Sequence, residues 1–461
     1  MTAFDYSTYL SPFTWRYGST HMRHIWSESY KRKLWRKIWV ALAKIQAKEG
    51  LVTKEELDDL IAHQNEIAIE ESHKIEQEIH HDLMAEIKVF ASQAKIGGGK
   101  IHLGATSMDI EDNTDAIRMQ ESLVLIEQKL QLLLSAFSKK IETYKDTVCM
   151  AYTHLQPAEP TTMGYRFALY AQDLLFDLKF LRFGKEMLKG KGIKGAVGTS
   201  ASYVSLLDRE KALTLEKEVM EELGIEPVLI SGQTAPRKIE YIIASMLSSI
   251  AQTGYKFAFD LRLMQSPGFG EWQEPFGTKQ VGSSAMPFKR NPIKAEQVCS
   301  LARLVFQLEG VARDNAAHSL LERTLDDSAN RRVFLAEMFL AIDTILQSLH
   351  SILEGLIMNE KQIQKNLSLH GPFAATERIL MEAVKRGANR QDIHEAIREN
   401  ALKAYETMKT TDRNPLQNLL ENDTQITTFL KKDEIETFLN PAEHVGLASK
   451  RCELLLKTLQ K

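Results

Sequence analysis

One loop of this chain gathers side chains that could move a proton next to a carboxylate. The segment 282–292 reads GSSAMPFKRNP and brings Ser283 close to Lys289 in sequence. A serine hydroxyl acts as a base only if a nearby cation and backbone N–H groups stabilise its alkoxide. Lys289 and the loop amides could supply both, and the glycine and prolines combine backbone freedom with stiffness. A flexible surface loop with incidental serine and lysine is the alternative interpretation.

A single histidine, His154, is the candidate acid. It lies in the segment 153–157, which reads THLQP, and more proline follows at residue 160. Such turns would hold the ring in a fixed orientation, and an imidazole exchanges protons near neutral pH. The alternative, which is the commoner case for a single histidine, is a structural role with satisfied hydrogen bonds.

Two further segments could bind anions. In 102–109, HLGATSMD, two hydroxyls follow a glycine and Asp109 could cap a helix, whose first N–H groups could face a carboxylate. In 322–332, ERTLDDSANRR, three arginines and a serine could clamp a phosphate or a carboxylate. Arg16 and Tyr17 form a weaker cationic and aromatic pair. Plain helix capping and a solvated, charged helix start are the respective alternatives.

Motifs for cofactors are weak in this sequence. Gly190, Gly192 and Gly195 formally match a dinucleotide fingerprint, but the tail of an expected helix precedes them where the fingerprint requires a strand. No GxxxxGK[ST] or HExxH segment occurs, and the adjacent His80 and His81 would not share a helix face. We therefore expect no cofactor and no metal.

Together these candidates comprise an acid, a base, hydroxyls placed to bind carboxylates and an arginine clamp. The set suits abstraction of a proton beside a carboxylate with loss of a leaving group, which is a β-elimination. The developing aci-carboxylate of that reaction must be held by fixed hydrogen-bond donors.

Long helices are expected to position these groups. Glycine (24) and proline (12) are scarce for 461 residues, and apolar residues recur in steps of four and three. One such seam consists of Leu335, Phe339, Ile342, Leu346, Leu349, Leu353 and Leu356. Further seams begin at Leu123, Phe167 and Ile243. This spacing predicts an all-α fold around a central bundle of long helices, with several short amphipathic helices as the alternative.

Composition limits the class of protein. Lys plus Arg (58) nearly balances Asp plus Glu (61), and the formal net charge of −3 gives no reason to expect nucleic-acid or membrane-surface binding. The three cysteines lie far apart, which favours a reducing compartment over a disulfide framework. No signal sequence and no run of eighteen apolar residues is evident. We expect a cytoplasmic protein.

Three domains are expected along the chain. The segment 1–106 is predicted to form an N-terminal helical domain, and 359–461 a C-terminal helical domain. Between them, 107–358 holds the long-helix bundle and the loop 282–292.

The motif GSSAMPFKRNP resembles the signature loop of the fumarase/aspartase superfamily. Within that superfamily the chain is similar to the adenylosuccinate lyase family, and the supporting motifs run in family order from Arg16 to about residue 397. They are IHLGATSMD (101–109), THLQPAEPTT (153–162), SGQTAPRK (231–238), LERTLDDSANRR (321–332) and GANRQDIHEAI (387–397).

The resemblance implies a cofactor-free lyase of purine biosynthesis. Family members release fumarate from adenylosuccinate, giving AMP, and from the ribotide SAICAR, giving AICAR. The resemblance further implies a homotetramer in which each active site combines segments of three subunits.

The resemblance also implies roles for individual residues. Ser283 matches the general base and His154 the general acid, while Glu296 matches the acid that pairs with this histidine. Residues that match groups around the carboxylates are Thr106, Ser107, Thr153, Gln233, Lys289 and Asn291. Residues that match nucleotide and phosphate contacts are Arg16, Tyr17, Arg323, Ser328 and Arg332. His81 and Asp82 match a His-Asp pair at the same site, and His102 matches a nearby histidine.

Two positions depart from the family pattern. His80 and Gln297 stand where some family members have arginine, so one cationic contact could be missing or replaced.

Two other functions stay open. A sister lyase acting on argininosuccinate or on fumarate and malate would not need a phosphate clamp. A non-catalytic structural protein could use the same helical bundle, although the intact Ser283, Lys289 and His154 argue against it.

Overall fold

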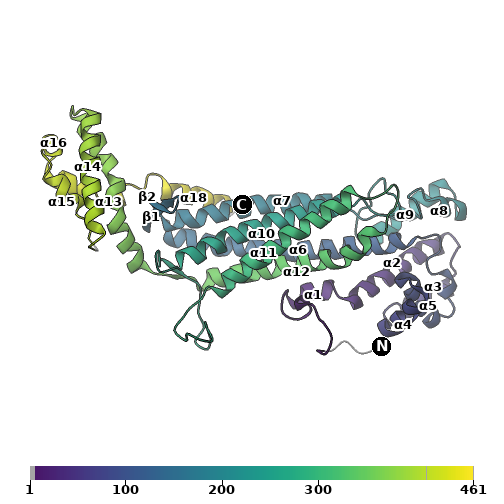
Figure 1. Ribbon diagram of the computed structural model, residues 1–461. Coiled ribbons are helices and arrows are strands. Elements are labelled where there is room, and N and C mark those ends of the chain that lie inside the picture. Colours follow the sequence, from purple (N-terminus) through teal and green to yellow (C-terminus); the bar gives the residue numbers. More distant parts are fainter. Residues whose placement is uncertain (1–5, 412, 460–461) are drawn as a thin grey trace. The chain divides into compact units, whose positions relative to one another are not determined.

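Long helices dominate the computed structural model, which describes residues 6–411 and 413–459 (Figure 1). The four predicted seams lie in α6 (Ser107–Tyr144), α7 (Met163–Met187), α10 (Lys238–Met264) and α12 (Asp326–Gly355). Another long helix, α11 (Ile293–Ala317), directly follows the loop 282–292. Seam residues such as Leu130 and Leu346 are buried. The predicted all-α fold with long helices is confirmed.

By the density of its internal contacts the chain divides into two compact units. Unit 1 comprises the chain up to Leu130, Asp177–Gly254 and Ser300–Gln347, and unit 2 comprises Gln131–Phe176, Tyr255–Cys299 and the chain from Ser348. This division cuts within the long helices. The predicted boundaries at 106 and 358 lie instead where α6 and α13 (Glu360–Lys385) begin, and the three-domain organisation stays a prediction.

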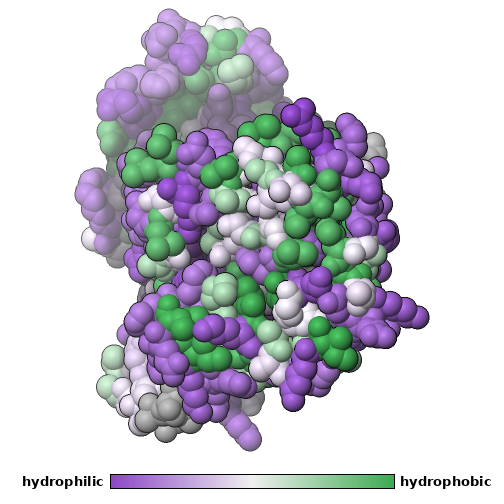
Figure 2. Space-filling model, turned by 90° about the vertical axis from the view of Figure 1, so that its right-hand side faces the viewer, coloured by the Kyte–Doolittle hydropathy of each residue, from purple (hydrophilic) through white to green (hydrophobic). Residues whose placement is uncertain are grey.

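Further helices, several of them with side-chain caps, belong to unit 1. They are η1 (Pro12–Thr14), α1 (Thr20–Ile25), α2 (Glu28–Lys48), α3 (Lys54–His63), α4 (Ile69–Ile79), α5 (Asp82–Gln93), η2 (Gly98–Lys100), α8 (Ala201–Leu206) and α9 (Arg209–Leu223). Ser27 caps α2 and Asp208 caps α9 through their side-chain oxygens. Trp35, Trp39 and Phe90 fill the core between α2 and α5. Figure 2 shows hydrophobic residues interspersed with hydrophilic ones at the end that carries α8 and α9.

Unit 2 contains a hairpin that the sequence analysis did not predict. Strands β1 (Val148–Thr153) and β2 (Gln156–Thr162) pair antiparallel, with Thr153 opposite Gln156. A second, minimal sheet pairs β3 (Trp272–Gln273) with β4 (Ile357–Met358). Phe167 stacks on Trp272 at 5.1 Å between ring centroids, which packs α7 against this sheet.

The C-terminal helices of unit 2 pack around their own apolar core. They are α13, α14 (Arg390–Met408), α15 (Leu416–Glu421), α16 (Thr424–Thr427), α17 (Lys432–Phe438), η3 (Pro441–Glu443) and α18 (Ala448–Leu459). Ile379, Ile393, Leu420 and Ile435 belong to one buried cluster. Helix α13 also contacts both strands of the hairpin, so it supports the turn between them.

Helix α12 differs in one respect from the expectation. By length and composition it is apolar enough to cross a membrane, whereas the sequence analysis found no such segment. Of its most apolar window, 67% is buried inside the structure, as in the core helix of a folded bundle.

Candidate functional site

His154 lies at the tip of the hairpin, where the backbone makes a tight turn. His154 and Leu155 both adopt positive φ angles, 54° and 60°. Two consecutive left-handed residues form the type I′ turn that suits the twist of a hairpin, but they are unfavourable for residues other than glycine. The paired strands and α13 hold this conformation, so His154 is exposed in a fixed position.

A cavity of about 500 Å³ opens beside His154, and we call it the hairpin cavity. Its polar lining includes Tyr152, Arg166, Tyr170 and Asp260. The Tyr170 hydroxyl donates to Asp260 at 2.7 Å, and Arg166 forms an ion pair with the buried Glu271 at 3.2 Å. The cavity can therefore accommodate a polar group without leaving its own charges unpaired.

Two backbone N–H groups of the loop 282–292 donate hydrogen bonds to the hydroxyl oxygen of Ser283. Its oxygen accepts hydrogen bonds from the N–H groups of Ala285 (3.3 Å) and Met286 (3.1 Å). Donors aimed at a hydroxyl oxygen stabilise its alkoxide more than its neutral form. The side chain of Asn291 closes the loop by donating to the carbonyl of Gly282 at 3.0 Å.

The loop can close in this way because residue 282 is glycine, and a larger residue would not fit there. A Cβ atom there would lie 1.9 Å from the carbonyl oxygen of Lys289. Lys289 and Glu296 are themselves exposed, with Glu296 in the first turn of α11. Gln297 accepts a hydrogen bond from Ser348 at 3.2 Å.

In unit 1, Thr106 and Ser107 lie where α6 begins. Asp109, the third residue of α6, accepts a hydrogen bond from the backbone N–H of Thr106 at 3.0 Å. This contact caps the N-terminus of the helix. The buried Asp109 also pairs with Lys191 from the glycine-rich segment. Gln233 reaches the hydroxyl of Thr106 at 3.5 Å, so the structure brings three predicted carboxylate contacts to one place.

Asp82, Ser328 and Arg332 line a cavity of about 140 Å³, which we call the clamp cavity, and His81 lies beside Asp82. His81 caps α5, and its ring lies 3.8 Å from the Asp82 carboxylate. Asp82 pairs with Arg332 at 2.9 Å. Burial alone would raise the pKa of Asp82, but Arg332 and the N–H of Leu83 hold this pKa below its usual value.

A buried charge network fixes the helices around the clamp cavity. Arg237 donates to Asp327 (2.6 Å) and Asp112 (2.9 Å), and Arg331 donates to Glu240 at 2.7 Å. Arg331 is therefore paired inside the protein, and Arg323 pairs with Asp327 at 3.4 Å, whereas Arg332 is the exposed arginine of 322–332. The network was not predicted from sequence because Arg237, Asp112 and Glu240 lie on segments far from 322–332.

The N-terminal pair lies in a loop tied to α12. Gly18 donates its N–H to Thr344 at 2.7 Å, and Ser19 donates to Asp343 at 2.6 Å. Arg16 is exposed, with its guanidinium 6.0 Å from the ring centroid of Tyr17.

His102 is a partly buried, neutral histidine. The indole N–H of Trp39 donates to its Nδ1 at 3.1 Å, so the ring proton lies on Nε2. Burial lowers the pKa of His102 to about 4, although Asp109 opposes this effect. The ring can therefore donate one hydrogen bond from Nε2 at neutral pH.

The predicted site residues thus lie in several groups. The structure brings together Asp82, Ser328 and Arg332 in unit 1, with His81 beside Asp82, and also Thr106 and Gln233. In unit 2, Ser283 and Asn291 share one loop, and Thr153 adjoins His154. Among residues 6–411 and 413–459, no hydrogen bond joins Ser283 to His154.

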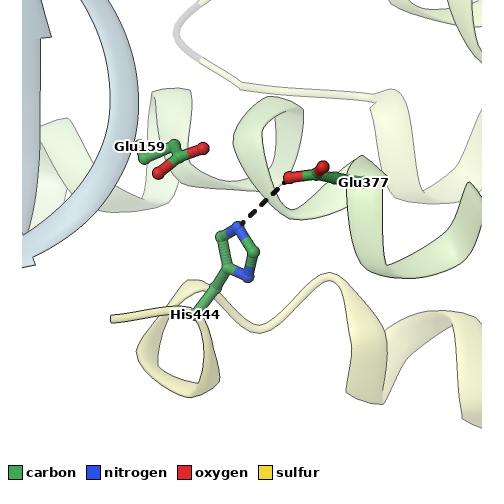
Figure 3. A group of neighbouring side chains, drawn as sticks. All are labelled: Glu159, Glu377 and His444. Atoms are coloured by element: carbon green, nitrogen blue, oxygen red, sulfur yellow. Dashed lines mark ion pairs between the residues drawn. The ribbon is translucent and has the colours of Figure 1, made fainter. Parts of the chain in front are cut away.

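One cluster in unit 2 has side chains of the type that hold metals. Glu159 on β2, Glu377 on α13 and His444 after η3 place one ligand atom each within 4.8 Å of the others (Figure 3). His444 forms an ion pair with Glu377 at 3.9 Å, and both glutamates are exposed. Exposed acidic groups are common without a bound ion, so this cluster alone does not indicate a metal site.

Replacing His102 with asparagine tests the neutral imidazole. Asparagine tolerates the positive φ of 69° and can accept from Trp39, but it cannot titrate. The folded pKa of about 4 lies below the value of 6.5 for an unperturbed histidine. As the pH falls through this window the unfolded chain binds the proton first, so stability is lost.

We expect the melting temperature to fall more steeply from pH 6.5 to 4 in the unmodified protein than in His102→Asn. Differential scanning calorimetry measures both slopes. Equal slopes would contradict the assignment of a neutral ring.

Comparisons with known proteins identify the family to which the chain belongs. Residues 16–307 match a family model described as Lyase, and residues 372–453 match one described as Adenylosuccinate lyase C-terminus. The adenylosuccinate lyase of Schistosoma mansoni is 38% identical, with 98% of this chain and 95% of that protein covered. The adenylosuccinate lyase of Methanocaldococcus jannaschii is also 38% identical, with 97% and 96% covered.

Solved structures share the fold at lower identity. The 3-carboxy-cis,cis-muconate lactonizing enzyme of Pseudomonas putida has a TM-score of 0.88 at 24% identity, covering 97% of this chain and 98% of that one. A fumarate lyase from Mesorhizobium sp. BNC1 has a TM-score of 0.85 at 21% identity, with 98% and 99% covered. The chain therefore belongs to the adenylosuccinate lyase family of the fumarase/aspartase superfamily.

Proposed function

We propose that this chain releases fumarate from adenylosuccinate, giving AMP, and from SAICAR, giving AICAR, in purine biosynthesis. The observation that carries the proposal is the clamp cavity, because a nucleotide substrate needs a cationic site for its phosphate. Ser328 and Arg332 line that cavity, and Arg323 lies on the segment that leads into α12. The names of the relatives at 38% identity support the same substrate.

The proposed reaction is a β-elimination with one base and one acid. The Ser283 alkoxide takes the proton from the carbon beside a succinyl carboxylate, and that electron pair forms the new C=C bond. The C–N bond breaks, and His154 gives a proton to the departing nitrogen. The two N–H donors at Ser283 support its role as base, with Lys289 as the proposed cation. Glu296 is the proposed partner of His154.

The remaining predicted residues have proposed binding roles. Groups proposed for the carboxylates are Thr106, Ser107, Thr153, Gln233, Lys289 and Asn291. Groups proposed for the nucleotide are Arg16, Tyr17, Asp82, His102, Arg323, Ser328 and Arg332, with His81 as a further catalytic group. The contact between Thr106 and Gln233 and the ion pair between Asp82 and Arg332 support this division.

We also propose a homotetramer with shared active sites, located in the cytoplasm. Leu169, Phe176 and Phe183 on α7 are exposed and recur every seven residues. Such a stripe is the pattern of a helix that packs against another helix. The proposed domains are 1–106, 107–358 and 359–461.

Ser283→Ala should lower kcat by roughly 10²- to 10⁴-fold, because it removes the proton acceptor. Adenylosuccinate should still bind, since the clamp cavity is unchanged. The assay follows AMP and fumarate, and the neighbouring Ser284→Ala is the matched control. Near-normal turnover in Ser283→Ala would show that the base is misassigned.

Arg332→Ala should raise KM for adenylosuccinate roughly ten- to hundredfold and change kcat less, because it removes a charge-assisted phosphate contact. Arg313→Ala, an exposed arginine on α11, serves as the control. If fumarate comes instead from argininosuccinate or malate, the substrate assignment is wrong. If no such substrate is turned over, a non-catalytic role is favoured.

Mixing two inactive variants tests the shared sites. Ser283→Ala and His154→Ala proteins, dissociated and reassociated together, should regain part of the activity because some sites then receive both intact groups. Each variant treated alone is the control. Full specific activity in a monomer peak on size-exclusion chromatography would refute the assembly.

A further inference from the structure

Glu111 is a carboxyl group of the clamp cavity to which the proposed reaction assigns no role. It lies on α6 and lines the cavity beside Asp82 and Arg332. Asp82 is paired with Arg332 at 2.9 Å, and Asp115 is paired with Arg331 at 3.1 Å. Among residues 6–411 and 413–459, by contrast, no hydrogen bond or ion pair involves the Glu111 carboxyl.

The charges around Glu111 disfavour its ionised form. Burial raises the pKa of Glu111 to about 8, and the carboxylates of Asp82, Asp112 and Asp115 add to this effect, while Arg332 opposes it. The other charged groups that line the cavity are Glu28, Lys31, Arg118 and Arg331. At neutral pH the Glu111 carboxyl therefore carries a proton and can donate a hydrogen bond.

The protonation of Glu111 sets the charge of the cavity. With Glu111 neutral, four cations and three carboxylates line the cavity, and one of the cations, Arg331, is also paired with Asp112 and Glu240 outside the lining. With Glu111 ionised, cations and carboxylates are equal in number. A phosphate monoester is a dianion above its second pKa of about 6 and offers only acceptor oxygens. It therefore binds best where every wall group donates.

We propose that Glu111 is a positioning residue of the clamp cavity, which donates a hydrogen bond to a substrate phosphate when neutral and repels that phosphate when ionised. The proposal rests on the nucleotide function proposed above. It adds a dependence on pH to phosphate binding, and this dependence is separate from the acid and base of the elimination.

The dissociation constant of AMP, measured by isothermal titration calorimetry from pH 7 to 9, tests the proposal. The phosphate stays dianionic over this range, so its own titration does not contribute. We expect the dissociation constant of the unmodified protein to rise about tenfold. The neutral fraction of Glu111 falls tenfold for each pH unit above its pKa of about 8, and pH 9 lies one unit above it. Glu111→Gln, which keeps a donor but no charge, should change by less than about twofold.

Glu142→Gln is the matched control, because it is the same substitution on the same helix at an exposed ion pair with Lys145. The dissociation constant of AMP for Glu142→Gln should still rise about tenfold from pH 7 to 9. Suppose that the dissociation constant of AMP rises as much in Glu111→Gln as in the unmodified protein, while the unmodified protein turns over adenylosuccinate normally. The role of Glu111 would then be overturned and the proposed function would stand. If the unmodified protein neither binds AMP nor cleaves adenylosuccinate, the proposed function fails and the role of Glu111 fails with it.

A second measurement covers the case in which Glu111→Gln does not fold. Calorimetry of the unmodified protein at pH 8.5, in buffers of different ionisation enthalpy, gives the protons exchanged on binding AMP. A net uptake of up to about three quarters of a proton is expected, because a group with a pKa of about 8 is about three-quarters ionised at pH 8.5 and the phosphate favours the neutral carboxyl. Binding without uptake would overturn the proposal.

Discussion

The geometry of unit 1 depends on the buried pairing of Arg237 and Arg331 with acids from three helices. Asp112 comes from α6, Glu240 from α10 and Asp327 from α12, so one network fixes the mutual position of these helices. Removing one member would leave an uncompensated buried charge, at a cost of about 3–5 kcal/mol. The next residue along α12, Arg332, is turned by about 100° about the helix axis and pairs with Asp82 at the clamp cavity. The buried network thus fixes the helix that carries Arg332.

Unit 2 positions its polar groups by a different principle. His154 lies at the tip of a hairpin and Ser283 in a loop, and each segment has a backbone feature that few residue types allow. At His154 this is a pair of left-handed residues, and at Gly282 it is a close contact that leaves no room for a methyl group. The strain at His154 persists because the paired strands and α13 hold the hairpin.

How much could be predicted from sequence depended on the distance between partners. The seam from Leu335 to Leu356 indicates α12 because helical periodicity is a local property. The hairpin around His154 was not predicted, since two prolines in β2 and non-glycine residues at the turn are poor strand signals. The partners of Arg331 were not predictable either, because Glu240 is 91 residues and Asp115 216 residues away in sequence. Pairings at such separations leave no trace in the spacing of a single sequence.

The ion pair between Asp82 and Arg332 has a consequence for the order in which the protein assembles. The two residues are 250 positions apart. At a ribosomal rate of about 5–20 residues per second, Asp82 waits on the order of 10–50 seconds for its partner to be synthesised. During that time α5 relies on nearer partners, such as the buried pairing of Glu86 with Arg36 on α2. The emerging chain can therefore build this helical layer early, while the clamp cavity forms only after the start of α12 has left the ribosome.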